Sequence, residues 1–115
     1  MEWISLKDSK QIDEIIAESR VTPVLIYKHS TRCNISRAAL DRLERKWDAS
    51  AIGNVKRYFL DLISFRAVSN QIAEIFEVEH HSPQILVISG GRSVLDLSHF
   101  DIEFDRIKSA FKPAA

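Results

Sequence analysis

The run Val24-Leu25-Ile26-Tyr27 constrains the fold of this chain more than any other segment. All four residues are apolar, and they do not alternate with polar ones. A strand with this pattern has both faces covered, as in a sheet that carries helices on either side. Pro23 stands just before the run and ends the amphipathic segment upstream, because proline cannot continue a helix. The pattern predicts an α/β domain with this strand near its centre.

Hydrophobic periodicity places further helices and strands around the central strand. Gly90-Gly91 lies between two apolar runs and predicts a tight hairpin, so the last two strands should be antiparallel. The expected strands span residues 3–6, 23–29, 55–62, 84–89 and 92–97, and the expected helices lie within residues 9–21, 33–47, 65–76 and 102–111. The order βαβαβαββα predicts one domain over residues 1–115, with a mixed sheet of four to five strands flanked by helices.

The expected helices each carry an apolar stripe and a candidate cap. Asp8 or Ser9 is expected to cap the first helix. Asp101, or Ser98 one turn earlier, is expected to cap the last one. The residues expected to face the core are Ile12, Ile15 and Ile16 in the first helix, Ile35, Ala39, Leu43 and Trp47 in the second, Phe65, Val68, Ile72, Ile75 and Phe76 in the third, and Phe104, Ile107 and Phe111 in the last.

Charge and cysteine content limit the function classes. Sixteen basic and sixteen acidic residues give a formal net charge of zero, so composition favours neither nucleic acid nor an anionic membrane as a partner. We expect no secretory signal, because the first residues lack a basic segment followed by an apolar one. A single cysteine makes no internal disulfide and fits a reducing compartment, so we expect a cytoplasmic protein. We also expect a monomer, since no apolar run is left unassigned to the core.

The only cysteine, Cys33, lies between an expected strand and an expected helix. Unpaired N–H groups and the partial positive charge at a helix N-terminus both favour a thiolate over a thiol. His29 and Arg32 add protonatable or positive groups nearby. A lone cysteine is also often a small buried hydrophobic residue. The polar neighbours, which include Ser30, Thr31, Asn34 and Ser36, favour the reactive interpretation.

Ser82-Pro83 stands just before an expected strand, fifty residues after Cys33. Together with the order of elements, this arrangement resembles the thioredoxin superfamily, in which a cis-proline faces the reactive cysteine. The resemblance implies that Pro83 is that cis-proline and that the backbone of Ser82 pairs with a bound substrate segment as an added strand. The alternative is an ordinary trans proline at the start of a strand.

The motif Cys33-Asn34-Ile35-Ser36 has serine where a resolving cysteine would stand, so it supports monothiol chemistry. The segments around it, together with Ser82-Pro83-Gln84 and residues 98–102, resemble the YtxJ-like bacillithiol system proteins, also called monothiol bacilliredoxins. Proteins of this kind usually have proline after the cysteine, where this chain has Asn34. Asn34 provides a backbone N–H at the helix start, which proline lacks. The effect of this change on the reactivity of the Cys33 thiol stays open.

The resemblance implies removal of bacillithiol from S-bacillithiolated client proteins, with bacillithiol as co-substrate and no bound cofactor or metal. It implies Cys33 as the nucleophile. The residues implied to stabilise the thiolate are Thr31, Arg32, Asn34 and Ser36, and those implied to bind substrate are Ser82, Pro83, His99 and Phe100. Arg32 helps only if its side chain turns inward. The strand before Cys33 carries no carboxylate, so the buried acid that assists some thioredoxins has no obvious counterpart.

The sequence alone leaves several alternatives open. Phe100 either lines the small-thiol pocket with His99 or packs in the core, leaving His99 exposed. Arg92 either binds a substrate carboxylate or is simply solvated. His80 and His81 are adjacent and do not readily converge on one metal ion. The chain as a whole is either an enzyme, a peptide-binding adaptor with an inert cysteine, or an iron–sulfur carrier. The last use typically requires glycine directly after the cysteine.

Overall fold

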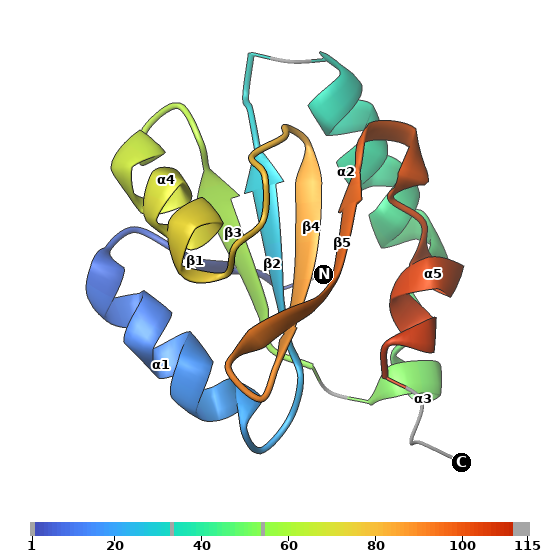
Figure 1. Cartoon of the computed structure of the whole chain (residues 1–115). Helices are drawn as coiled ribbons and strands as arrows, with labels where there is room; N and C mark the ends of the chain where they lie inside the picture. Colours follow the sequence, from blue (N-terminus) through green and yellow to red (C-terminus); the bar gives the residue numbers. More distant parts are fainter. Residues whose placement is uncertain (1, 33, 54, 112–115) are drawn as a thin grey trace.

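The computed structural model describes residues 2–32, 34–53 and 55–111. Within them, five strands form one mixed sheet, and helices cover both of its faces (Figure 1). The strands lie in the order β1-β3-β2-β4-β5. In chain order the elements are β1 (Ile4–Ser5), α1 (Ser9–Ser19), β2 (Val24–His29), α2 (Asn34–Lys46), α3 (Ala49–Ile52), β3 (Arg57–Asp61), α4 (Arg66–Ile75), β4 (Gln84–Ser89), β5 (Arg92–Ser98), the 3₁₀ helix η1 (His99–Asp101) and α5 (Phe104–Ser109).

Strand β2 is the central strand, as its apolar run predicted. It runs parallel to β3 on one side and antiparallel to β4 on the other. Every residue from Val24 to His29 is buried. Strands β1 and β3 are also parallel, and β4 and β5 form the expected antiparallel hairpin. The predicted α/β class and the mixed sheet are therefore confirmed.

Two hydrophobic cores lie on opposite faces of the sheet. Helices α1 and α4 cover one face, and α2 and α5 cover the other (Figure 1). Successive residues of β2 point to opposite faces of the sheet, so Ile26 belongs to the first core and Tyr27 to the second. The side chains of Lys28 and His29 must consequently enter different cores, which decides their roles below.

The hairpin between β4 and β5 is tied to the end of α1. Gly90 and Gly91 have φ of 62° and 77°, a left-handed conformation that glycine adopts without steric cost. The Gly90 N–H donates to the Ser19 carbonyl at 2.8 Å, and the Gly91 N–H donates to Ser19 Oγ at 2.9 Å. The start of α1 is equally well defined, because Asp8 caps it in a capping box with Gln11. The expectation for Asp8 is confirmed.

Two residues expected in the core are exposed. Ile35 is 47% exposed and Ile75 is 49% exposed, so both expectations are wrong. In α2 the buried residues are Ser36, Ala39 and Leu43. Their spacing of three and four follows the helical repeat of 3.6 residues, whereas a row spaced only by four drifts about 40° around the helix at each step. In α4 the core position after Ile72 is taken by Phe76 instead of Ile75.

The C-terminal region differs most from expectation. Residues 99–101 form η1, and α5 begins only at Phe104, with Glu103 as its N-cap. The expectation that Asp101 or Ser98 caps the last helix is therefore wrong. His99 has φ of 54°, outside the right-handed helical region, so one helix cannot run continuously from this point. The short helix α3 was not expected either.

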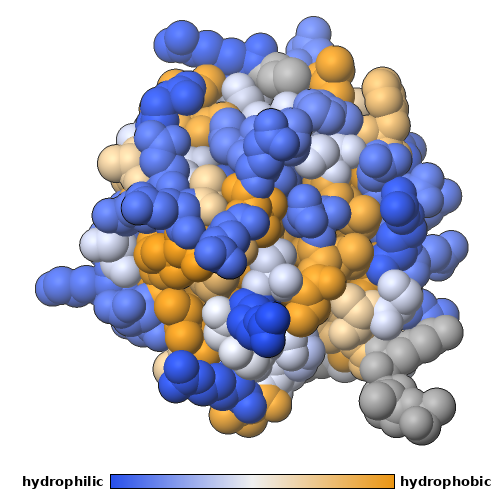
Figure 2. Space-filling model, in the orientation of Figure 1, coloured by the Kyte–Doolittle hydropathy of each residue, from blue (hydrophilic) through white to orange (hydrophobic). Residues whose placement is uncertain are grey.

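In the part of the chain that the structure describes, no helix has the length and apolar character needed to cross a membrane. On the face seen in Figure 2, hydrophilic side chains are widely spread, and hydrophobic ones form several separate patches between them.

Candidate active site

The segment around Cys33 connects β2 to α2. Cys33 itself lies outside the described residues, but the chain on both sides of it is placed. Strand β2 ends at His29, residues 31 and 32 form a turn, and α2 begins at Asn34. The predicted change from strand to helix at this motif is therefore confirmed, and the N-terminus of a 13-residue helix starts immediately after the cysteine in the sequence.

Ser36 is the buried polar residue of the motif. It lies in the first turn of α2 and has no exposed surface. Its Oγ accepts a hydrogen bond from the Ser30 N–H at 3.1 Å and lies 2.8 Å from His29 Nδ1. Its carbonyl oxygen accepts a hydrogen bond from the Tyr27 hydroxyl at 3.0 Å. Strand β2 and the turn after it therefore fix the position of Ser36.

His29 fills the space between β2, β3 and α2. It is buried, and the centre of its ring lies 5.1 Å from that of Phe59. Burial lowers the pKa of His29, while the negative charges of Asp61 and Asp41 act to raise it and Arg37 acts to lower it. Burial is the largest of these effects, so the pKa of His29 lies below its usual value. The sequence analysis named His29 only as a nearby protonatable group and missed its contact with Ser36.

The Ser82–Pro83 peptide bond is cis. Pro83 is buried, and its carbonyl oxygen accepts a hydrogen bond from the His99 N–H at 3.1 Å. This bond holds η1 beside the proline. Ser82 is half-buried, and its Oγ is inaccessible and has no hydrogen-bond partner among the described residues. Ser82, Pro83 and His99, which the sequence analysis grouped as substrate-binding residues, therefore lie together.

A groove of about 190 Å³ lies between η1 and the start of α2. Phe100 is 75% exposed at its edge, so the alternative that Phe100 packs in the core is wrong. His99 is exposed as well. The groove is lined by Asn34, Ile35, Ala38, Ala39, Arg42, His99 and Phe100. It joins residues from the cysteine motif to residues from the late loop that the sequence analysis singled out.

Other candidate residues stand apart from these contacts. Thr31 and Arg32 are exposed, so the Arg32 side chain does not turn inward as its suggested role required. Arg92 is exposed at the hairpin, beside the N-terminal end of β2, because Val24 pairs with Ile88. Cys33 follows the other end of β2. The structure therefore does not bring Arg92 to the site.

A second polar cluster lies under the opposite face of the sheet. Lys28 has no exposed surface, and its Nζ donates to the Ser69 carbonyl at 3.2 Å and lies 3.3 Å from His80 Nδ1. Burial lowers the pKa of Lys28 to about 8. His80 thus pairs with Lys28, while the His81 ring lies 5.8 Å from that of His99. Lys28 directly follows the apolar run of the central strand. This position is the sequence signal that could have predicted a buried polar cluster.

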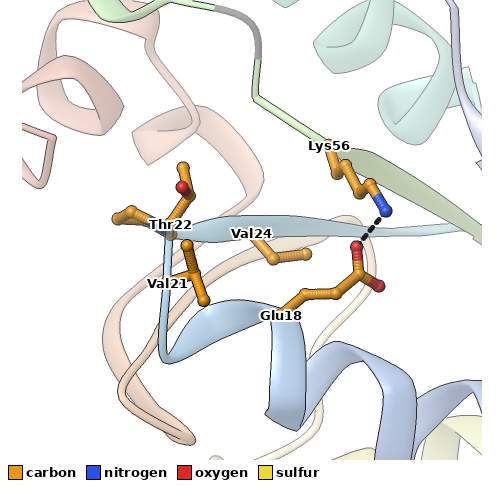
Figure 3. Close-up of a pocket in the computed structure, with 6 residues that line it drawn as sticks. Glu18, Val21, Thr22, Val24 and Lys56 are labelled. Carbon is orange, nitrogen blue, oxygen red and sulfur yellow. Dashed lines mark ion pairs between the residues drawn. The ribbon is translucent and has the colours of Figure 1, made fainter.

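A separate pocket of about 290 Å³ lies at the N-terminal end of β2 (Figure 3). Lys56 pairs there with Glu18, which also accepts a hydrogen bond from the Tyr58 hydroxyl at 2.6 Å. Val24 at this end and His29 at the other are five residues apart, or roughly 17 Å along a strand. This pocket is not part of the site around the cysteine motif. No group of three or more potential metal ligands occurs among the described residues.

The fold and the cysteine motif together define a class of protein. A five-stranded mixed sheet, a lone cysteine that lies in the sequence between the central strand and a helix, and a cis-proline directly before β4 define a thioredoxin-fold protein with a monothiol motif. Residues 4–107 match the family described as monothiol bacilliredoxin BrxC. The chain therefore belongs to the monothiol bacilliredoxin family.

Several solved structures share the fold of this chain. The chain is similar to a candidate oxidoreductase with a thioredoxin fold, with a TM-score of 0.80 and 29% identity over 95% of this chain and 93% of that one. A thioredoxin from Fasciola hepatica has a TM-score of 0.70 and 16% identity over 95% of this chain and 99% of its own. Thioredoxin O2 from Arabidopsis thaliana has a TM-score of 0.67 and 20% identity over 96% of this chain and 95% of its own. The two thioredoxins share the fold of this chain. Membership of the bacilliredoxin family, together with the thioredoxin fold, supports a thiol redox function.

Proposed function

We propose that this protein is a cytoplasmic monothiol exchange protein that removes bacillithiol from mixed disulfides on client proteins. The observation that carries the proposal is Ser36, which stands three residues after Cys33 and is fully buried against β2. A hydroxyl at this position cannot form a disulfide with Cys33. The exchange therefore stops at a mixed disulfide with a small thiol, which a second molecule must release.

The reaction has two balanced steps. The Cys33 thiolate attacks the bacillithiol sulfur of the client, so an S–S bond forms between Cys33 and bacillithiol while the old S–S bond breaks. The client cysteine leaves as a thiolate. A second thiol, either free bacillithiol or a partner reductant, then attacks the bacillithiol sulfur on Cys33 and restores the Cys33 thiolate. Each step exchanges one disulfide for another, so no further oxidant or reductant is needed.

The start of α2 supports the nucleophile in this scheme. The N-terminal N–H groups of a helix and its partial positive charge stabilise a nearby thiolate. Asn34 keeps a backbone N–H at the first helical position, which proline would remove. We expect the pKa of Cys33 to lie below the value of about 8.5 for a free thiol.

The surface beside the motif supports the binding of a client. We expect the backbone of Ser82, which precedes Pro83 across a cis peptide bond, to pair with an extended client segment. Ile35 and Phe100 offer exposed apolar surface in the groove between α2 and η1. In the proposal, the client backbone lies along residue 82 while its bacillithiol group occupies the groove.

Mass spectrometry tests the proposal directly. The reduced protein is mixed with a client that carries one bacillithiol, and the intact masses of both are followed over time. We expect the client to lose one bacillithiol and this protein to gain one at Cys33. The Cys33→Ser variant should gain none.

The same client carrying glutathione provides the comparison arm. Transfer from the glutathionylated client at an equal or higher rate would redirect the small-thiol assignment. An unchanged mass of this protein in both arms would rule out the first half-reaction, and with it the proposed function.

A further inference from the structure

The loop between α4 and β4, residues 76–83, contains Ser82, whose backbone is free of hydrogen bonds. Among the described residues, neither the N–H nor the carbonyl of Ser82 has a partner, and its inaccessible Oγ has none either. Unpaired backbone groups are the groups to which an added segment can bind. Because Ser82 makes no such bond itself, its position depends on how the residues on either side of it are held.

Two buried side chains hold the residues that precede Ser82. Lys28 on β2 and Gln84 on β4 pair directly across the two strands, and neither has exposed surface. Gln84 Nε2 donates to the Glu79 carbonyl at 2.9 Å, and Lys28 Nζ lies 3.3 Å from His80 Nδ1. Together these two contacts form a clamp that fixes residues 79 and 80 from inside the protein.

The other side of Ser82 is fixed as well. The Pro83 carbonyl accepts a hydrogen bond from the His99 N–H at 3.1 Å, which joins the start of β4 to η1. Ser82 therefore lies between this bond and the clamp, only two residues after His80. A shift of residues 79 and 80 would consequently move the Ser82 backbone.

The protonation states of Lys28 and His80 allow their contact at pH 7. A lysine ammonium only donates, so His80 Nδ1 must be unprotonated to accept. Burial has the largest effect on the pKa of His80 and lowers it, and Lys28, Arg66 and His81 lower it further. The Ser69 carbonyl on α4 accepts a second hydrogen bond from Lys28 at 3.2 Å, which sets the direction of the amine. Methionine at position 28 would fill the volume but make neither bond.

We propose that Lys28 and Gln84 are positioning residues for client binding, which hold the loop before β4 so that the Ser82 backbone meets an extended client segment. Neither side chain has exposed surface, so neither touches the client. Both act through residues 79 and 80. This role rests on the exchange with client proteins proposed above.

A comparison of two bacillithiol donors tests this role. One donor is a synthetic peptide with a single S-bacillithiolated cysteine, and the other is the symmetrical disulfide of bacillithiol, which has no peptide segment to pair with Ser82. With either donor, the Cys33 thiolate forms an S–S bond with one bacillithiol sulfur and one thiolate leaves, so the protein gains the same mass. Initial rates of this gain are measured by mass spectrometry for the wild type, Lys28→Met and Gln84→Met.

The measured quantity is the ratio of the peptide rate to the small-disulfide rate. We expect this ratio to fall by at least about threefold in each variant, because a misplaced Ser82 backbone affects the donor that pairs with it. Lys28→Met removes a buried charge, so its stability should not fall and a lower ratio cannot come from unfolding.

Ile72→Val is the matched control. Ile72 is equally buried, in the core under α4, and the loss of one carbon lowers stability without removing a contact of the clamp. Its ratio should equal that of the wild type. A general loss of stability would give the opposite order, with Ile72→Val below Lys28→Met.

Hydrogen–deuterium exchange measures the clamp without any transfer reaction. At pH 7, residues 76–84 should exchange faster in Lys28→Met and Gln84→Met than in the wild type, because one anchor of the loop is lost. In Lys28→Met, helix α2 should exchange no faster than in the wild type, so that the change is confined to the loop.

Three results would overturn the inference: unchanged exchange of residues 76–84 in both variants, an equal loss of rate with both donors, or no loss with either. If the wild type takes up bacillithiol from the peptide and the ratio does not change, the inference fails and the proposed function stands. If the wild type takes up none from either donor, the proposed function fails. Faster exchange in the variants would then still show that the clamp fixes the loop.

Discussion

Among the described residues, Lys28 has the most unusual environment. Its amine is fully buried in the central strand, and its hydrogen-bond partners are neutral, namely the Ser69 carbonyl and the His80 ring. Burying a charge without an opposite charge is costly. The lowered pKa of about 8 reflects that cost. We therefore expect Lys28 to reduce stability at neutral pH.

Replacing this lysine with methionine should stabilise the protein. We expect Lys28→Met to raise the free energy of unfolding at pH 7 by about 1–3 kcal/mol, measured by urea denaturation, because a buried charge is removed while the volume is kept. An exposed control, Lys10→Met on α1, should change it by no more than about 0.5 kcal/mol. A less stable Lys28→Met protein would contradict this account.

The same variant tests the sign of the pH dependence. The folded chain releases the Lys28 proton near pH 8, whereas an unfolded lysine holds its proton to about pH 10.4. Between these values the unfolded chain binds more protons, so this group makes the wild type more stable as the pH rises. We therefore expect the advantage of Lys28→Met at pH 7 to shrink at pH 9.5. An advantage that stays constant or grows would contradict the assignment.

At the scale of elements, α2 shows what the sequence predicted and what it did not. The helix and its start after Cys33 followed from hydrophobic periodicity and from the polar turn. The sequence did not predict which residue of the first turn faces the core, because the side chain of Ile35 is more apolar than that of Ser36. The hydroxyl is nevertheless the buried group, since Ser30, His29 and Tyr27 hydrogen-bond to Ser36. Hydropathy alone does not indicate a buried polar residue whose partners lie on a neighbouring strand.

The groove between α2 and η1 gives a prediction for substrate binding. We expect Phe100→Ala to slow bacillithiol transfer from a client by roughly three- to tenfold, the size typical for truncating one apolar contact residue. Alkylation of Cys33 by iodoacetamide should stay unchanged, because Phe100 is 75% exposed and its loss leaves the core intact. Both rates are measured on the same preparation.

Ile75→Ala provides the matched control for this prediction. Ile75 is 49% exposed on α4, on the other face of the sheet, so its loss should affect neither rate. Equal transfer by Phe100→Ala and the wild type would exclude the groove as the binding surface. Slower alkylation in Phe100→Ala would show that the substitution disturbs the motif itself.

At the scale of the whole molecule, the central strand organises both the fold and the site. Its apolar run predicted a strand between helices, and the glycine pair predicted the hairpin beside it, because local sequence determines both features. The contacts of Lys28 with His80 and of His29 with Ser36 join segments that a strand and a helix bring together. Such contacts depend on the register of the strands and on the face of the sheet or helix to which each side chain points. A single sequence determines neither of these directly.

We propose that this fold activates Cys33 as a nucleophile, and the alkylation rate of Cys33 measures this activation. The rate with iodoacetamide at pH 7 is measured for the folded protein and for the same protein unfolded in urea, with a free cysteine as reference. Each unit by which the pKa falls raises the thiolate fraction about tenfold and lowers its intrinsic nucleophilicity by about threefold. We predict that the folded protein reacts at least about threefold faster than the unfolded protein. Equal or slower alkylation in the folded state would contradict the account and favour an adaptor with an inert cysteine.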